Sequence, residues 1–217
     1  MTYDGVVSRY LNRPLSRPAA RALAHTPVTP NAVTGFTLLL ACVAGAALAL
    51  GWNVAGGVGI QLVSVIDGVD GELARLKNMA TRFGEVFDAV TDRYADAVML
   101  AGMTVYAARF ESHPHPETVG ILALAGALVV SYSRARIEAD LGSEPALAGG
   151  SMDSVFGLAS RDVRSLVAAV GAVAGQCWWT LIVLAAISSL TVAWRLVYLR
   201  VNRIGFSQPP AKPRPEL

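Results

Sequence analysis

The chain has 217 residues, of which 53% are hydrophobic and only 16% are charged, and its formal net charge is +2. An average soluble domain has roughly 25% charged residues, so this composition argues against a water-soluble globular domain and also against a disordered chain. The two cysteines, Cys42 and Cys177, each lie in an apolar run. This placement argues against a disulfide framework or a zinc site.

Residues 1–29 predict a cytoplasmic, juxtamembrane amphipathic helix. Four arginines recur every four residues with apolar residues between them, which places them along one face of a helix. They are Arg9, Arg13, Arg17 and Arg21. We expect this helix to lie in the membrane interface with its arginines against anionic headgroups. Pro14 and Pro18 predict that it is kinked or begins late.

Charge-free stretches within residues 30–203 predict a domain of six transmembrane helices, because a membrane-spanning helix needs about 20 mostly apolar residues. The expected spans lie within 33–50, 54–66 with the residues that follow, 97–108, 121–130, and the two halves of 165–194. The last stretch would be about 45 Å long as one helix, which exceeds a bilayer core of about 30 Å. We therefore place turns at 51–53, 111–116 and 175–176.

The distribution of Lys and Arg predicts the orientation in the membrane, because positive residues mark the cytoplasmic side. With six spans, all of the 18 basic residues except Arg109 fall on one side. We therefore expect an integral protein of a prokaryotic cytoplasmic membrane, with both termini on the cytoplasmic side. The proline-rich residues 204–217 predict a disordered cytoplasmic tail.

Four aspartates follow the second apolar stretch and lie on two faces of neighbouring predicted helices. At about 100° per residue, the first helix presents two aspartates and two small residues on one face, and the second presents residues spaced by four. The two sets are Asp67, Asp70, Gly71 and Ala74, and Gly84, Asp88 and Asp92. Acidic groups in a membrane cost several kcal/mol unless they are compensated, so these carboxylates require cations.

Oxygen-only ligands of this kind suit Mg²⁺, Mn²⁺ or Ca²⁺ rather than zinc. Two divalent ions that share carboxylates would bring the local charge near zero. A site of two metals beside small residues predicts a diphosphate substrate, because paired metals assist displacement at phosphorus. The alternative is that the acids form ion pairs with Arg75, Lys77, Arg82 and Arg93, although ion pairing explains neither the shared faces nor the glycines.

The same residues carry a family resemblance. The pattern Asp67-x2-Asp70-Gly71-x2-Ala74-Arg75-x8-Gly84-x3-Asp88-x3-Asp92 resembles, at every position, the signature of the CDP-alcohol phosphotransferases, also called CDP-alcohol phosphatidyltransferases. The six-span layout and the Pro30-Asn31-x2-Thr34 entry to the first span are similar to that family as well. The resemblance implies an all-α integral membrane enzyme that transfers a phosphoalcohol group from a CDP-alcohol to an acceptor hydroxyl and releases CMP.

The resemblance also implies roles for individual residues. Two divalent cations, Mg²⁺ first and Mn²⁺ as the alternative, would be bound by Asp67, Asp70, Asp88 and Asp92, and Asp92 would also be the catalytic general base. The cytidine diphosphate would be bordered by Asn31, Thr34, Asp70, Gly71, Ala74, Arg75 and Gly84. In members of the family that use inositol phosphate, a few residues bind the acceptor phosphate, and their counterparts here are Ser131, Arg134 and Arg161. The alternative is that the two arginines only follow the positive-inside rule and contact lipid headgroups.

The segments Asp4–Ser16 and Arg161–Arg164 resemble the branch that joins CDP-inositol to inositol phosphate, the di-myo-inositol phosphate phosphate synthases. A CDP-diacylglycerol donor, with inositol phosphate or glycerol phosphate as acceptor, stays open. The resemblance implies a homodimer among membrane lipids, and we expect no nucleic-acid partner. Two rival functions are a membrane prenyltransferase, which has a different aspartate spacing, and a cation-coupled transporter, which predicts an inverted repeat that we do not find.

Overall fold

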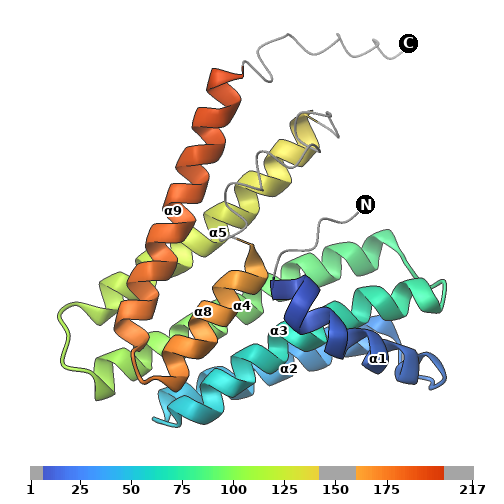
Figure 1. Ribbon diagram of the computed structural model, residues 1–217, viewed down its shortest axis with the longest axis horizontal. Coiled ribbons are helices and arrows are strands. Elements are labelled where there is room, and N and C mark those ends of the chain that lie inside the picture. Colours follow the sequence, from blue (N-terminus) through green and yellow to red (C-terminus); the bar gives the residue numbers. More distant parts are fainter. Residues whose placement is uncertain (1–6, 142–159, 203–217) are drawn as a thin grey trace, which may run out of the picture.

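A computed structural model describes residues 7–141 and 160–202, and these residues are almost entirely helical, with no strand among them (Figure 1). The elements are η1 (Ser8–Asn12), a π-helical turn, and the α-helices α1 (Arg13–Ala24), α2 (Pro30–Ala49), α3 (Asn53–Leu76), α4 (Arg82–Phe110), α5 (Pro116–Leu141), α8 (Arg161–Val173) and α9 (Cys177–Val201). The all-α prediction is confirmed. The predicted tail, residues 204–217, lies outside the described residues.

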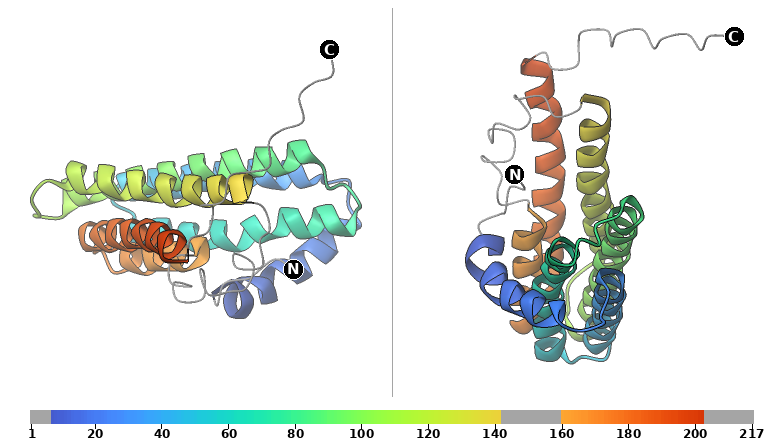
Figure 2. Two further views of the ribbon diagram at one scale, coloured as in Figure 1. Left: turned by 90° about the horizontal axis from the view of Figure 1, so that it is seen from above. Right: turned by 90° about the vertical axis from the view of Figure 1, so that its right-hand side faces the viewer.

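The long helices form two layers, which Figure 2 shows from above. α2, α4 and α5 lie in one layer and α3, α8 and α9 in the other, while α1 covers the outer side of α3. α2 packs against both α3 and α4, α8 packs against α3, and α5 pairs with α9. In Figure 1, α5 and α9 run together beyond the end of the other helices. α3 is therefore held between α2, α8 and α1.

Local capping explains where several helices begin and end. Thr29 caps α2 by accepting a hydrogen bond from the backbone N–H of Ala32 at 3.3 Å. Thr81 caps α4 in the same way through Gly84 at 3.0 Å. α2 ends before Gly51, whose φ of +89° is a left-handed conformation that glycine adopts without strain. The breaks between α2 and α3, between α4 and α5, and between α8 and α9 occur at the three predicted turns.

At the end of the molecule that lies away from the aspartates, Glu111 binds the start of α9. Its carboxylate accepts hydrogen bonds from the backbone N–H groups of Cys177 at 2.6 Å and Trp178 at 3.0 Å. An acidic side chain at this position satisfies donors that have no partner within the helix and complements the helix dipole. The loop after α4 is thereby joined to α9.

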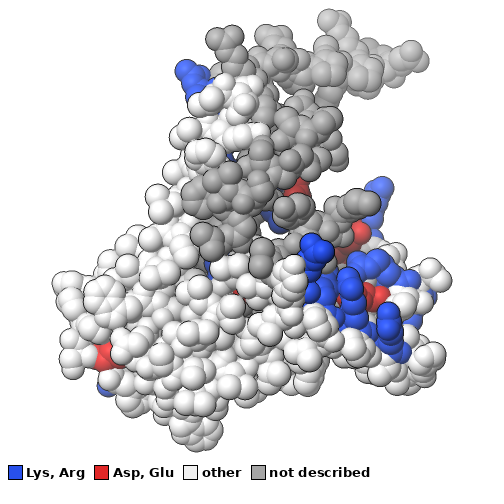
Figure 3. Space-filling view, viewed as in Figure 1, with Lys and Arg blue, Asp and Glu red and all other residues white. Residues whose placement is uncertain are grey.

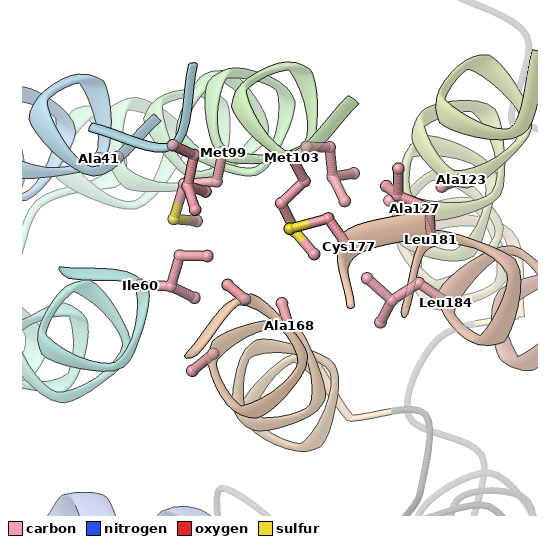
Figure 4. Packing of buried hydrophobic residues seen from close by; sticks show 14 of the residues in the cluster. Ala41, Ile60, Met99, Met103, Ala123, Ala127, Ala168, Cys177, Leu181 and Leu184 are labelled. Atoms are coloured by element: carbon pink, nitrogen blue, oxygen red, sulfur yellow. The ribbon is translucent and has the colours of Figure 1, made fainter. Parts of the chain in front are cut away.

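The core contains small residues and a few larger apolar side chains. Met99 and Met103 of α4 point toward Ile60 of α3, Ala168 of α8 and Leu181 of α9 (Figure 4). Many of the other buried positions are alanines. Small side chains let helices approach closely, which is typical of helix contacts in membranes.

The crossing of α2 and α4 depends on two glycines. A Cβ atom at Gly45 would lie 2.7 Å from the carbonyl oxygen of Val98, and one at Gly102 would overlap the backbone of Gly45. These two glycines thus pack on each other within one chain.

Among the described residues, four helices are long and apolar enough to cross a membrane, namely α2, α3, α5 and α9. α4 and α8 are not among these four helices. The first half of α4 carries Asp88 and Asp92, and the 13 residues of α8 span only about 20 Å. The six long helices that follow α1 correspond in order to the six predicted spans, although the crossing of all six stays a prediction. In Figure 3, most of the visible face is uncharged, and Lys and Arg side chains gather over the region of α1.

We expect Gly102→Ala to lower the stability of the protein by about 1–3 kcal/mol, because the added methyl group would push α2 and α4 apart. Gly35→Ala is the matched control, since a Cβ atom there meets nothing within 4 Å. It should be neutral or stabilise the helix by up to about 1 kcal/mol. Thermal unfolding of both variants in one detergent measures the difference. Equal midpoints would contradict the close packing of α2 on α4.

Candidate metal centre

Two neighbouring helices bring three of the predicted aspartates together. Asp67 lies in the second half of α3, and Asp88 and Asp92 lie one turn apart in the first half of α4. One oxygen from each carboxylate lies within 4.8 Å of the other two. Because residues four apart share a helical face, Asp88 and Asp92 point the same way. α2 packs against both α3 and α4, and this arrangement brings that face of α4 near Asp67.

Asp70 lies at the edge of this group and is oriented by hydrogen bonds. Its side chain is 6% exposed. Thr34 of α2 donates its hydroxyl to Oδ2 at 2.6 Å, and the backbone N–H of Gly71 donates to Oδ1 at 2.5 Å. Asp70 is also close enough to Asp88 to interact with it electrostatically. The four aspartates therefore form one acidic cluster, which α2 helps to orient.

Arg161, the first residue of α8, projects into the cluster. Its guanidinium lies 2.6 Å from Asp67 Oδ1, 2.8 Å from Asp92 Oδ2 and 3.5 Å from Asp96 Oδ1. Arg93 is more distant, at 3.7 Å from Asp92 and 3.5 Å from Asp96. A single arginine from a distant part of the chain thus contacts acids of both α3 and α4.

Two of the four basic residues in the alternative interpretation have contacts that bear on it. Of its four basic residues, Arg93 forms an ion pair with Asp92. Lys77 instead donates to the backbone carbonyls of Thr26 at 2.5 Å and Val28 at 2.7 Å, which joins α3 to the connection between α1 and α2. Its ammonium group is therefore engaged outside the acidic cluster.

The donor set fits divalent metal ions. Within the described residues, the four aspartates of the cluster and Asp96 supply five carboxylates, and the guanidinium groups of Arg93 and Arg161 contact three of them, which leaves an excess of negative charge. All of the convergent side-chain donors are oxygens, the ligands that Mg²⁺ and Mn²⁺ prefer. Arg161 contacts two of the same carboxylates, so a bound cation and this guanidinium would share them.

The residues expected to border a cytidine diphosphate lie around this cluster. A Cβ atom at Gly84 would lie 3.4 Å from Asn31 Oδ1, so the start of α2 meets the first turn of α4 there. A Cβ atom at Gly71 would lie 3.7 Å from Arg75 Nη1. Ala74 follows on the same face of α3 and is half-buried. The structure thus brings the predicted residues of α2, α3 and α4 to one end of the helices.

The three residues expected to bind the acceptor have different surroundings. Arg161 lies among the aspartates, as described above. Ser131 of α5 accepts a hydrogen bond from Arg93, the residue that follows Asp92. Arg134 lies on an exposed face of α5, where it forms an ion pair with Glu138 at 2.9 Å.

Arg93 and Asp96 also take part in the contacts around the acidic cluster. Asp96 continues the four-residue spacing of the predicted acidic face and contacts both Arg93 and Arg161. Arg93 links Asp92 of α4 to Ser131 of α5. No local pattern marks that link, because it depends on which helix packs beside α4.

Comparison with known proteins places the chain in a family. Residues 27–185 match the family profile described as CDP-alcohol phosphatidyltransferase. A "Bifunctional IPC transferase and DIPP synthase" of Rubrobacter xylanophilus is 40% identical over 200 residues, which are 92% of this chain and 44% of that protein. A phosphatidylinositol phosphate synthase of Mycobacteroides abscessus is 32% identical over 207 residues, 92% of this chain and 90% of that protein.

The fold is also similar to a solved structure. The apo crystal structure of Mycobacterium tuberculosis phosphatidylinositol phosphate synthase aligns with a TM-score of 0.68 and 25% identity, covering 84% of this chain and 95% of that one. The chain therefore spans less than half of the Rubrobacter protein but nearly the full length of the mycobacterial relatives.

We expect Asp88→Asn to raise the Kd for Mn²⁺ at least about tenfold, because even residues that only support metal ligands change affinity by that amount. Glu85→Gln removes the same charge one turn earlier, from an exposed position on α4. It should change the Kd by no more than about twofold, as is typical of exposed charges. Electron paramagnetic resonance of free Mn²⁺ measures both values. Equal effects of the two substitutions would contradict a site built on Asp88.

Proposed function

The chain belongs to the CDP-alcohol phosphatidyltransferase family, and on this premise we propose that it transfers a phosphoalcohol group from a CDP-alcohol to the hydroxyl of an acceptor alcohol and releases CMP. Family membership and four long apolar helices make it an integral membrane protein. The same membership decides against the prenyltransferase and transporter alternatives. The observation that carries the proposal is the convergence of Asp67, Asp88 and Asp92 beside Asp70.

We assign these four aspartates to two divalent cations, with Mg²⁺ first and Mn²⁺ as the alternative. When bound, the cations would neutralise the diphosphate of the donor and stabilise the charge on the departing CMP. The role of Thr34 in this arrangement is to orient Asp70 through its 2.6 Å hydrogen bond. Thr34 would thereby hold Asp70 in position to bind a cation.

The nucleotide would lie against the start of α2 and the facing turns of α3 and α4. Asn31, Gly71, Ala74, Arg75 and Gly84 surround this position, as the contacts at Gly71 and Gly84 indicate. The absence of side chains at the two glycines leaves room for phosphates close to the backbone. The Arg75 guanidinium beside Gly71 offers N–H donors to phosphate oxygens.

Asp92 is assigned as the general base. Its carboxylate takes the proton of the acceptor hydroxyl as that oxygen attacks the phosphorus that carries the donor alcohol. A new oxygen–phosphorus bond forms, and the bond between this phosphorus and the bridging oxygen of the diphosphate breaks. CMP leaves with the bonding electron pair. The 2.8 Å contact between Arg161 and Asp92 Oδ2 holds the carboxylate in place.

The best-supported acceptor is inositol phosphate. The names of the Mycobacteroides and M. tuberculosis relatives both specify phosphatidylinositol phosphate synthesis. Ser131, Arg134 and Arg161 are assigned to the acceptor phosphate, because guanidinium groups bind phosphate through paired N–H donors. The donor is either the soluble CDP-inositol or the lipid CDP-diacylglycerol, and glycerol phosphate is the competing acceptor.

The proposed cellular setting follows the sequence interpretation. Residues 1–29 would lie on the cytoplasmic membrane surface of a prokaryote, and residues 30–203 would form six spans with the aspartates at the cytoplasmic end. Both termini would be cytoplasmic. We also propose that two copies associate among membrane lipids.

We expect purified protein to release CMP only when a divalent cation, a CDP-alcohol and an acceptor are all present. Separate reactions with CDP-inositol and CDP-diacylglycerol, each with inositol phosphate or glycerol phosphate, identify the substrates. Asp92→Asn should lower kcat by about 10²–10⁴-fold, the usual contribution of a general base. Asp140→Asn is the control, since Asp140 pairs with Arg136 on an exposed part of α5 at 2.8 Å.

Near-wild-type turnover by Asp92→Asn would remove the proposed base. CMP release that needs no acceptor would indicate hydrolysis instead of transfer.

We expect Arg134→Gln to raise the KM for inositol phosphate about tenfold, because a charged hydrogen bond to phosphate contributes about 1.5–3 kcal/mol. The KM for the donor should stay unchanged. Arg136→Gln is closely matched, because both arginines are exposed and each pairs with an acid four residues later. It should leave both KM values unchanged. Steady-state kinetics with each substrate varied in turn measures both KM values. Equal changes in the two variants would mean that Arg134 acts only through its surface charge and does not bind the acceptor phosphate.

A further inference from the structure

α3 has a second polar face besides the one that carries Asp67 and Asp70. Its members are spaced by three or four residues, which places them on one side of a helix. They are Gln61, Ser64, Gly68 and Glu72. At about 100° per residue, this face is roughly a third of the circumference away from the face of the aspartates. It meets η1 and α1, which lie against α3 in both views of Figure 2.

The first part of this contact is neutral. Asn12 is only 3% exposed. Its side-chain amide donates to Ser64 Oγ at 3.0 Å and accepts from Gln61 Nε2 at 3.1 Å. Because a buried amide without partners costs free energy, these bonds favour one register of η1 against α3.

The second part is an ion pair. Arg13 Nη1 lies 2.7 Å from Glu72 Oε1, and the two side chains are 16% and 11% exposed. Arg17 approaches the same oxygen at 3.6 Å but is 61% exposed. Between the two parts, a Cβ atom at Gly68 would lie 3.5 Å from both Arg13 Nη1 and Ser16 Oγ, so α1 and α3 approach to van der Waals contact there. We call these contacts of Asn12, Arg13 and Ser16 with the second face of α3 the polar seam.

The arginine stripe of the N-terminal helix therefore divides into two sets. The sequence predicts that all four arginines meet headgroups. Arg13 instead turns inward to Glu72, whereas Arg9, Arg17 and Arg21 stay exposed. The physical reason is that Glu72 is a buried acid and requires a positive partner.

We propose that the polar seam positions the aspartates of α3, with Arg13 and Glu72 as its main positioning residues. Gly68 directly follows Asp67, and Glu72 lies two residues after Asp70, so the seam and the aspartates share two turns of one helix. A shift of α3 by one residue would rotate both faces by about 100° and leave Glu72 buried without its partner. The seam thus opposes any rotation that would turn Asp67 and Asp70 away from α4. This inference rests on the proposed metal site.

The test uses Mn²⁺ affinity, because positioning and simple charge predict opposite changes in the Kd of Arg13→Gln. Removal of a positive charge near a cation site should tighten Mn²⁺ binding if charge alone acts, and removal of a negative charge should weaken it. Positioning instead predicts that Arg13→Gln and Glu72→Gln each raise the Kd about tenfold. The double variant should be no weaker than either single variant, because both break the same contact.

Two further variants complete the design. Asn12→Ala changes no charge and should still raise the Kd severalfold, so it carries the test if the charged variants fold poorly. Arg21→Gln removes an exposed charge from the same helix and should leave the Kd within about twofold of wild type. Thermal unfolding of every variant checks that it is folded.

Two outcomes would overturn the proposal. One is tighter Mn²⁺ binding by Arg13→Gln together with weaker binding by Glu72→Gln. The other is an unchanged Kd for Mn²⁺ in both of these variants and in Asn12→Ala. Asp70→Asn separates this failure from failure of the metal site. If Asp70→Asn weakens Mn²⁺ binding and the seam variants do not, the seam inference alone is wrong. If Asp70→Asn has no effect, the proposed metal site falls and the inference falls with it.

Discussion

Carboxylates that are buried between helices must meet positive charge, and this requirement organises the functional end of the molecule. α3 and α4 supply the aspartates, and α8 begins with the arginine that lies between them. The remaining negative charge suits divalent cations bound by oxygen ligands. The helices around this end are consequently joined by polar contacts, whereas the interior beyond them is packed with alanine, glycine, methionine and leucine.

α3 is the helix on which these contacts converge. Thr34 reaches its aspartate face from α2, Arg161 reaches the same face from α8, and Arg13 pairs with Glu72 on another side. At the opposite end of α3, Asn53 donates to the carbonyl of Val173 in α8 at 3.1 Å. A helix held by polar contacts on several sides and at both ends has little freedom to rotate, which suits a helix that carries two of the proposed metal ligands.

Much of the fold and part of the site followed from local sequence. The turns at Gly51 and Gly175 were marked by glycines between apolar stretches, and the structure has both. The aspartate faces followed from helical spacing, and three of the four carboxylates converge. The inward turn of Arg13 did not follow, because an exposed and a buried arginine look alike in a four-residue repeat. The ion pair of Arg161 with the aspartates also depends on the placement of α8, which no spacing within α8 specifies.

The sequence by itself determined the helical class, the order of the helices and the faces on which the aspartates lie. It could do so because hydrophobic runs, turn residues and a period of about 3.6 residues act over short distances along the chain. Tertiary structure alone decided that Arg161 meets Asp67 and Asp92, that Thr34 orients Asp70, and which arginine of the N-terminal stripe is buried. Those contacts join residues far apart in the chain, and they arise only when the packing of whole helices leaves a buried charge that one particular distant side chain can reach.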